Sequence, residues 1–465
     1  MVYFKKFTIL LIIAAILKSV VSVSAVSSTP EFRNFAGRAA ILAEVDSGQI
    51  LFERNKNMRL PADGLARLMT LKLAVAAIER GDADPFDLVE MTHSAWENIS
   101  SACETRNILP EEQMTLLDLM YSAFVGNASE AANLIAEHIA GSVREFVTMM
   151  NSAAEDLGLE NTNFVNAHGR HNSAQVTTAA DQFEIFRHAM TFPLFAEISS
   201  TLRHTTRATN MSESRTFVST NELLNAGTKY YFTPSLSGIV SATFEGGHSY
   251  VGFAETEGMS LIVVVLGSDV IMHPDGSATM RNLSEAQRLF TWGFANFGWH
   301  TILGINDLVA RAPVTHGAGA DFVNLRPESS IVMVLYNDFP MDSFIRTPTI
   351  YSVAAGTPLF APIEAGEVLG EITITRAGVE YGTVLLVANT NIELNRLEYI
   401  RMQISDILDT STARAIIAIL AVLVTGYIAL VVRYNLLRRR RINEIAAAKA
   451  KLAEERKQNE DEYQY

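Results

Sequence analysis

The chain has 465 residues, of which 48% are hydrophobic and 19% are charged. Because it is longer than one compact domain of typical size, we expect two or more folded units. The formal net charge of -14 argues against nucleic acid as a partner, since binding a polyanion requires a clustered basic face.

The first residues have the order of a secretory signal. Lys5 and Lys6 precede an apolar stretch over 7–17, and small residues follow at 23–25. We predict that residues 1–25 are a signal peptide that is cleaved after export. The alternative is a retained membrane helix, but Lys18 leaves the apolar run short of a span of roughly 20 residues.

Residues 39–53 contain two short apolar runs on either side of the turn residues Asp46-Ser47-Gly48, and this pattern predicts a β-hairpin. Residues 65–81 carry apolar side chains at helical spacing and predict a helix ended by Gly81. Helices are also predicted over 114–124, 130–139, 143–157, 179–190 and 282–297, and strands over 238–243, 250–255 and 260–266. Strands that flank a helical insert favour an α+β domain, which we place at 30–302.

The pattern changes beyond residue 303 to short alternating runs separated by Gly and Pro. Strands are predicted over 331–336, 350–353, 368–374 and 383–388, within an all-β domain at 303–393. Residues 394–412 form an amphipathic linker, which either lies on a bilayer or only connects.

A membrane span is predicted at 413–433, because residues 415–432 are uncharged. Arg433 and the arginines at 438–441 follow this uncharged stretch, and the positive-inside rule keeps them in the cytoplasm. A buried core helix would not explain this arginine cluster. The resulting protein crosses the cell membrane once, with the main domains outside. The cytoplasmic tail is 434–465, and residues 443–465 within it are predicted to be either a solvated helix or disordered.

Cys103 is the only cysteine, so the chain has neither a disulfide scaffold nor a thiolate metal site. We interpret Cys103 as a structural thiol, since no base lies near it in sequence. Glu137, His138 and His171 lack the H-E-x-x-H spacing of a zinc site. We therefore predict no metal and no cofactor.

Several phrases together carry a family resemblance. They are AEVDSGQILFERN at 43–55, LPADGLARLMT at 60–70, ASEAANLIAEHIAGSVREFVTMMN at 128–151, TNFVNAHGR at 162–170 and GMSLIVVVLG at 258–267. The sequence resembles the serine D-alanyl-D-alanine carboxypeptidases, which are the low-molecular-weight penicillin-binding proteins. The resemblance implies a β-lactamase or transpeptidase-like fold, followed by a β-rich domain and a C-terminal membrane anchor. It also implies peptidoglycan stem peptides, or a wall-synthesis membrane complex, as partners.

That family uses the motifs S-x-x-K, S-x-N and K-T-G to acylate a serine and then hydrolyse the acyl-enzyme. Aligned on Leu68-Met69-Thr70, the first motif places Gly64 at the nucleophile and Arg67 at the lysine. Aligned on Pro61-Ala62, it places Asp63 and Ala66 there instead. Both alignments lack the serine and the lysine, and arginine cannot act as the base because it stays protonated.

The second motif aligns with Asn127-Ala128-Ser129, in which serine and asparagine have exchanged places. These residues either keep a role in the site or only cap the helix that follows. The third motif aligns with Val240-Ser241-Ala242, where valine removes the cation that meets the substrate carboxylate. His168, in a loop that resembles N-P-H-G, is interpreted as a structural hydrogen-bonding residue rather than a base.

Three functions follow as hypotheses. The first is a catalytically inactive relative that binds or regulates at the wall, because all three motifs are altered together. The second is an active D-Ala-D-Ala carboxypeptidase with Ser129 or Ser241 as a non-standard nucleophile. The third is a membrane-tethered structural or signalling protein, in which the β-rich domain and the tail matter more than the cleft that holds the active site in the family.

Overall fold

The structure is a computed structural model that describes residues 30–97, 99, 103–243, 245–256, 258–275 and 278–461. The predicted signal peptide lies outside the described residues. The chain divides into two compact units. Unit 1 extends to Ile302 and also includes Val332–Ser343, whereas unit 2 comprises Leu303–Ile331 and Phe344 onwards.

Unit 1 is built on a five-stranded antiparallel sheet with the order β2-β1-β11-β10-β9. Two strands come from before the helical insert and three from after it, as the sequence predicted. Their bounds are β1 Ala39–Glu44, β2 Ile50–Arg54, β9 Ser235–Thr243, β10 Gly247–Thr256 and β11 Met259–Ser268. The α+β class is thereby confirmed.

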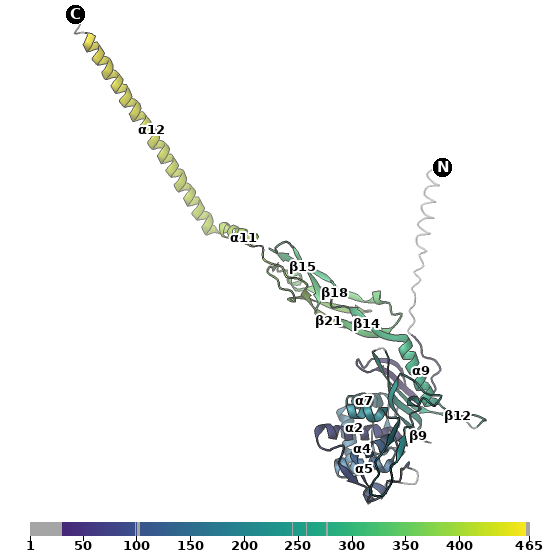
Figure 1. The fold of residues 1–465 in the computed structure, drawn as a ribbon. Coiled ribbons are helices and arrows are strands. Elements are labelled where there is room, and N and C mark those ends of the chain that lie inside the picture. The colour runs from purple at the N-terminus through teal and green to yellow at the C-terminus, as the bar shows by residue number, and fades with distance from the viewer. Residues whose placement is uncertain are drawn as a thin grey trace, which may run out of the picture. The chain divides into compact units, whose positions relative to one another are not determined.

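Both faces of the central strand β11 are buried. Successive side chains point to opposite sides of a strand, so alternate residues of β11 enter two different cores. Ile262, Val264 and Leu266 join the core formed with the helical insert. Val263 and Val265 join the core on the other face, which α9, Arg281–Asn296, covers with Leu289 and Phe290. Figure 1 shows α9 separated from α2, α4, α5 and α7.

The insert contains most of the helices. They are α2 Ala66–Arg80, α3 His93–Glu97, α4 Leu116–Phe124, α5 Ser129–Ala140, α6 Val143–Asp156, α7 Ala179–Ala189 and α8 Pro193–Ser200, with 3-10 turns η1 Asp63–Leu65 and η2 Glu222–Leu224. Gly81 ends α2 in the left-handed conformation with φ 77°, as predicted. Short strand pairs complete the unit: β3 Leu60–Pro61 with β6 Val176–Thr177, β4 Leu88–Glu90 with β5 Gln113–Thr115, β7 Arg203–Thr205 with β8 Thr216–Val218, β12 Val270–Met272 with β13 Ala278–Met280, and β14 Phe297–Leu303 with β17 Ile331–Tyr336.

Unit 2 contains a six-stranded sheet with the order β18-β20-β21-β16-β15-β19, so an all-β module is confirmed. The predicted strand over 331–336 forms as β17 but pairs with β14 outside this sheet, and Val332–Ser343 belong to unit 1. The strands are β15 Ala310–Thr315, β16 Phe322–Pro327, β18 Ile345–Ile350, β19 Leu359–Phe360, β20 Val368–Arg376 and β21 Val379–Ala388. The 3-10 turn η3, Met341–Ser343, precedes β18 and belongs to unit 1.

The predicted strand over 350–353 is wrong. Strand β18 ends at Ile350, which forms its last pair with Gly370, and α10, Tyr351–Ala355, follows at once. Gly356 closes this single turn of helix in the left-handed conformation, with its N–H directed at the Ser352 and Val353 carbonyls. Alternating apolar residues cannot by themselves distinguish such a short turn from the end of a strand.

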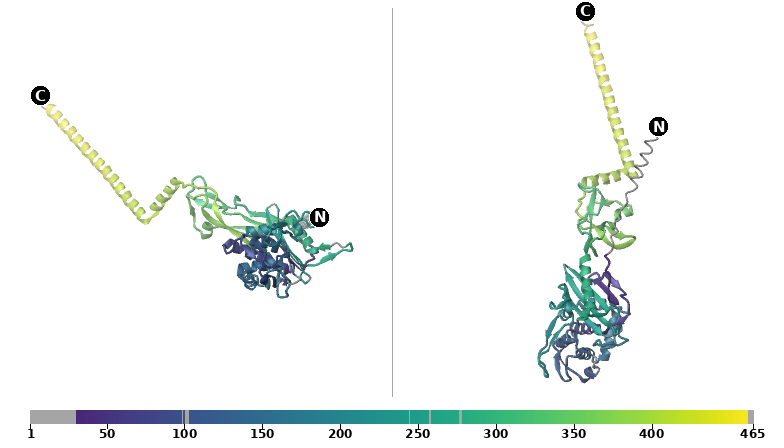
Figure 2. Two further views of the ribbon diagram at one scale, coloured as in Figure 1. Left: turned by 60° about the horizontal axis from the view of Figure 1, so that its bottom comes forward. Right: turned by 90° about the vertical axis from the view of Figure 1, so that its right-hand side faces the viewer.

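Two helices end the described chain: α11, Arg396–Asp409, and α12, Ser411–Asp461. Within α12, the stretch Ser411–Glu454 reaches a mean hydropathy of 2.8 in an 18-residue window, and none of that window is buried. It is long and apolar enough to cross a membrane. Helix α12, yellow in Figures 1 and 2, continues without interruption through 443–461. Of the two alternatives predicted for the tail, these residues adopt the helix.

Candidate functional site

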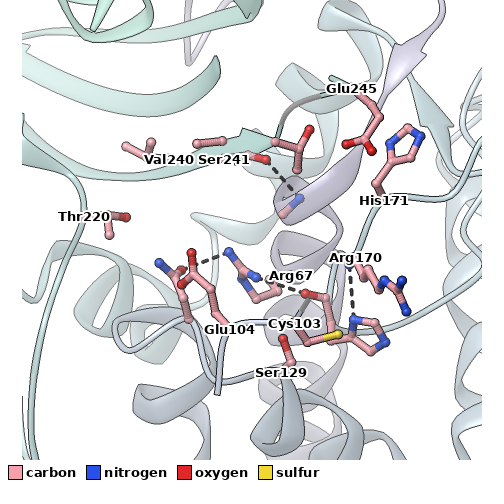
Figure 3. Close-up of a pocket in the computed structure, with 16 residues that line it drawn as sticks. Arg67, Cys103, Glu104, Ser129, Arg170, His171, Thr220, Val240, Ser241 and Glu245 are labelled. Atoms are coloured by element: carbon pink, nitrogen blue, oxygen red, sulfur yellow. Dashed lines mark hydrogen bonds between the residues drawn. The ribbon is translucent and has the colours of Figure 1, made fainter. Parts of the chain in front are cut away.

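A pocket of about 470 Å³ opens in unit 1 beside the start of α2 (Figure 3). Strand β9, the start of α5 and the loop 168–171 form its other walls. All seven positions that the three motif alignments identified line it, namely Gly64, Arg67, Asn127, Ser129, Val240, Ser241 and Ala242. Residues separated by up to 178 positions are therefore brought to one cavity by the fold.

The structure distinguishes the two alignments of the first motif. Gly64 and Arg67 line the pocket, whereas Asp63 and Ala66 are not among the described residues that do. Asp63 adopts a left-handed conformation, φ 45°, which is uncommon outside glycine. Its buried carboxylate accepts the Thr243 hydroxyl and lies 2.9 Å from His171 Nδ1. Asp63 thus ties the start of the helix to β9 and to the loop 168–171.

Arg67 is a buried cation held by two hydrogen bonds. Its guanidinium donates to the His168 carbonyl at 3.0 Å and to Asn127 Oδ1 at 2.9 Å, while Nε has no hydrogen-bond partner. Burial lowers the pKa of Arg67 to about 10, Glu104 acts in the opposite direction, and Arg106 lowers it further. At neutral pH the side chain remains protonated, so it cannot accept a proton from a nucleophile.

A side chain at Gly64 would crowd Arg67 and Ser241. A Cβ built there would lie 2.8 Å from Arg67 Nη2 and 3.0 Å from Ser241 Oγ. The Gly64 N–H also donates to Ser241 Oγ at 3.0 Å, drawn as a dashed line in Figure 3. A side chain at position 64 would therefore meet Arg67 and Ser241, the residues at two other motif-aligned positions.

These contacts predict that Gly64 and Arg67 are energetically coupled. Gly64→Ser is expected to cost about 2 kcal/mol, since the new side chain is forced against the buried guanidinium. In an Arg67→Lys background the same change is expected to cost less, because lysine lacks the Nη2 atom. Thermal unfolding of the wild type, both single variants and the double variant measures the coupling. Additive costs would contradict the contact.

Asn127 and Ser129 do not cap α5, so the capping alternative is wrong. The N-cap residue is Ala128, which makes no side-chain hydrogen bond there. The Asn127 amide is directed at Arg67 instead, from a left-handed backbone with φ 55°. Ser129 is the first residue of α5 and is buried against the pocket. Both residues therefore belong to the pocket wall.

Strand β9 supplies the third wall. Val240, Ser241 and Ala242 pair with residues of β10, Ser241 standing opposite Ser249. Among the described lining residues, the arginines come from α2 and from the loop 168–171, and β9 contributes no cation. A carboxylate presented along β9 would meet Val240, whose side chain carries neither a charge nor a hydrogen-bond donor.

His168 is buried in the loop that bounds the pocket. Its Nδ1 accepts the Arg170 N–H at 3.1 Å, and its carbonyl accepts from Arg67. Burial, together with Arg67 and Arg170, lowers the pKa of His168 to about 4. The ring is thus neutral at physiological pH, and its Nδ1 takes part in a hydrogen bond within the loop.

Sequence reasoning missed several lining residues. Cys103, Glu104, Thr220 and Glu245 also line the pocket. The segment that carries Cys103 and Glu104 is held by Glu130, whose Oε1 accepts the Arg106 and Ile108 N–H groups. Burial raises the pKa of Glu130. No motif marks these positions, because their approach to the pocket depends on loop conformation alone.

The fold and the site together define a penicillin-binding-protein-like domain, with a pocket where its sheet meets its helical part. Residues 24–270 match the D-alanyl-D-alanine carboxypeptidase family, and the chain belongs to that family.

Characterised relatives cover most of the chain. D-alanyl-D-alanine carboxypeptidase DacF of Bacillus subtilis is 24% identical over 343 residues, which is 73% of this chain and 82% of that protein. DacA of Haemophilus influenzae is 26% identical over 382 residues, 80% of this chain and 91% of that protein.

Solved structures share the fold. Penicillin binding protein 6B from Escherichia coli aligns with a TM-score of 0.59 and 22% identity, over 78% of this chain and 98% of that one. Penicillin binding protein 5 from Haemophilus influenzae aligns with a TM-score of 0.58 and 24% identity, over 78% and 99%.

Proposed function

We propose that this chain is a non-hydrolytic member of the carboxypeptidase family that binds peptidoglycan stem peptides in the pocket beside α2. The observation that carries the proposal is the position of Arg67 and Ser241, which fill the space above Gly64. A pocket of about 470 Å³ remains next to them. It is large enough to hold part of a peptide.

The chemistry of the remaining groups supports binding over hydrolysis. Arg67 is protonated at neutral pH, and His168 uses Nδ1 to accept a backbone N–H. Among the described residues, neither Ser129 nor Ser241 makes a hydrogen bond to a side chain that could take its proton; Ser241 Oγ accepts the Gly64 N–H. An acylation step needs a base that accepts the nucleophile's proton.

We further propose an extracytoplasmic location. In this topology residues 1–25 are removed after export and the domains at 30–302 and 303–393 face the wall. The linker 394–412 leads to a span at 413–433, and residues 434–465 lie in the cytoplasm. The apolar 18-residue window within Ser411–Glu454 and the arginines at 438–441 support this arrangement. The module would present wall peptides to, or sense them for, a membrane complex of wall synthesis.

The test uses the full-length protein in detergent with labelled penicillin and with a wall peptide that ends in D-Ala-D-Ala. We expect no covalent labelling and no release of D-alanine, but saturable binding of the peptide. Thr220→Trp, an exposed change at the rim, is expected to weaken binding about tenfold by narrowing the pocket.

Two results would contradict the proposed function. Labelling that disappears in Ser129→Ala or Ser241→Ala would establish the active alternative, with that serine as nucleophile. If the wild type does not bind the peptide, the proposed binding function is wrong, and the structural or signalling role is the hypothesis that remains.

A further inference from the structure

A second pocket, of about 700 Å³, lies on the other side of the loop that bounds the first. It is enclosed by α5, α6 and the residues 165–172. Its lining residues are Asn133, Val143, Arg144, Val147, Thr148, Val165, Asn166, His168, Arg170, His171 and Asn172. Two arginines and no carboxylate stand among these described residues, although the chain as a whole is acidic.

Three residues, His168, Arg170 and His171, line both pockets and form the partition between them. His168 is only 5% exposed. Because its Nδ1 accepts the Arg170 N–H, the neutral ring carries its hydrogen on Nε2. The partition therefore offers a hydrogen-bond donor from a buried ring and a guanidinium from the exposed Arg170.

Asn133 supplies a polar group at the α5 wall. The side chain is fully buried, and its Nδ2 donates to the Ala95 carbonyl at 3.0 Å. Its Oδ1 has no hydrogen-bond partner. A buried carbonyl oxygen left without a donor costs free energy, so a ligand N–H at this position would be favoured. An anionic oxygen would be repelled there.

Valines form the apolar part of the lining of this second pocket. Val143, Val147 and Val165 line the pocket and are half-buried. They suit methyl-sized side chains. Arg144 lies 3.8 Å from Glu145, but both side chains are exposed, at 91% and 59%, so this pair is weak. The guanidinium of Arg144 is therefore available to an anion.

We propose that the second pocket binds the carboxylate end of a short peptide with small side chains. Arg144 and Arg170 pair with the carboxylate, Asn133 Oδ1 accepts a peptide N–H, and the valines contact the side chains. The inference goes beyond the proposed function, because peptide binding in the first pocket does not require the second. It gives the chain two peptide sites separated by one loop.

The experiment titrates the full-length protein in detergent with N-acetyl-D-alanyl-D-alanine, with the same dipeptide as its C-terminal amide, and with inorganic phosphate. Isothermal calorimetry measures each affinity. We expect the amide to bind about tenfold more weakly than the acid, because the charge-assisted hydrogen bonds are lost. Phosphate is expected to compete poorly, since it cannot donate a peptide N–H to Asn133.

Matched variants assign the site. Arg144→Gln and Thr148→Trp change only the second pocket, and each is expected to weaken binding of the acid about tenfold. Thr220→Trp changes only the first pocket, so it is expected to weaken the binding event that the proposed function places there and to leave unchanged the event that Arg144→Gln and Thr148→Trp weaken. Arg80→Gln, in an exposed pair with Asp82 at the end of α2, controls for loss of one positive charge.

Several results would overturn the inference. If Thr220→Trp abolishes binding while Arg144→Gln and Thr148→Trp do not, the dipeptide occupies the first pocket, and the proposed function stands without a second site. Equal affinity for the acid and the amide would show that the pocket does not recognise the carboxylate. Displacement by phosphate at similar concentrations would indicate a general anion site, and absence of any binding to the wild type would leave no site.

Discussion

Replacing Gly169 by alanine is expected to destabilise unit 1 by about 4 kcal/mol. Gly169 has φ 79°, a conformation that costs an L-residue roughly 1–2 kcal/mol. An added Cβ would also lie 2.5 Å from the Asp63 carbonyl oxygen and 2.6 Å from Gly64 Cα. Both are backbone atoms of η1, directly before α2, so the contact cannot be relieved by turning a side chain.

The control for this variant is Gly158→Ala. Gly158 has a similar φ of 72°, but nothing lies within 4 Å of its Cβ position. It carries only the conformational cost, which is about 1 kcal/mol. Thermal unfolding of both variants separates backbone strain from close packing. Equal shifts in Tm would mean that the loop 168–171 is not packed against Asp63 and Gly64.

Glu112→Gln is expected to destabilise unit 1 by about 3 kcal/mol at pH 7. Burial alone would raise the pKa of Glu112, but Arg215, Thr209 and the Leu109 N–H outweigh it and lower the pKa to about 2. Arg215 donates to both carboxylate oxygens, at 2.6 and 2.9 Å. A fall from the ordinary 4.5 to about 2 corresponds to about 3 kcal/mol.

The sign of the pH dependence follows from the lowered pKa. The stabilisation is fully present above about pH 5, because the carboxylate is then ionised in both the folded and unfolded states. It is lost as the pH falls from about 5 towards 2. Melting curves of wild type and variant should therefore converge at acidic pH. A Tm difference that is independent of pH would contradict the ion pair, and Asp82→Asn, in an exposed pair, should change Tm little.

One partner of this ion pair is close in sequence to a residue that lines the first pocket. Arg215 precedes β8, and Thr220, which lines the pocket, follows that strand two residues after its end. Glu112 and Arg215 are separated by 103 residues. Sequence periodicity offers no sign that they meet, because each lies in an irregular segment.

The architecture could largely be predicted from sequence. The buried run in β11, the apolar spacing in α2 and the uncharged stretch inside α12 each satisfy a local pattern that one type of element fulfils. The failure at 350–353 came where the local pattern fits both a strand and a helical turn. There the last pair between Ile350 and Gly370 sets the end of the strand.

At the site, the sequence by itself determined that Gly64, Arg67 and Val240 cannot supply a nucleophile, a base and a strand cation, since these are properties of the residue types. Only the tertiary structure decided that Arg67 and Ser241 fill the space above Gly64, that Asn127 bonds to Arg67 instead of capping α5, and that Cys103 reaches the pocket. The reason is physical: side-chain chemistry is carried by each residue, but the contacts that use it join segments distant in sequence. Those contacts exist only after the sheet and the helical insert have packed.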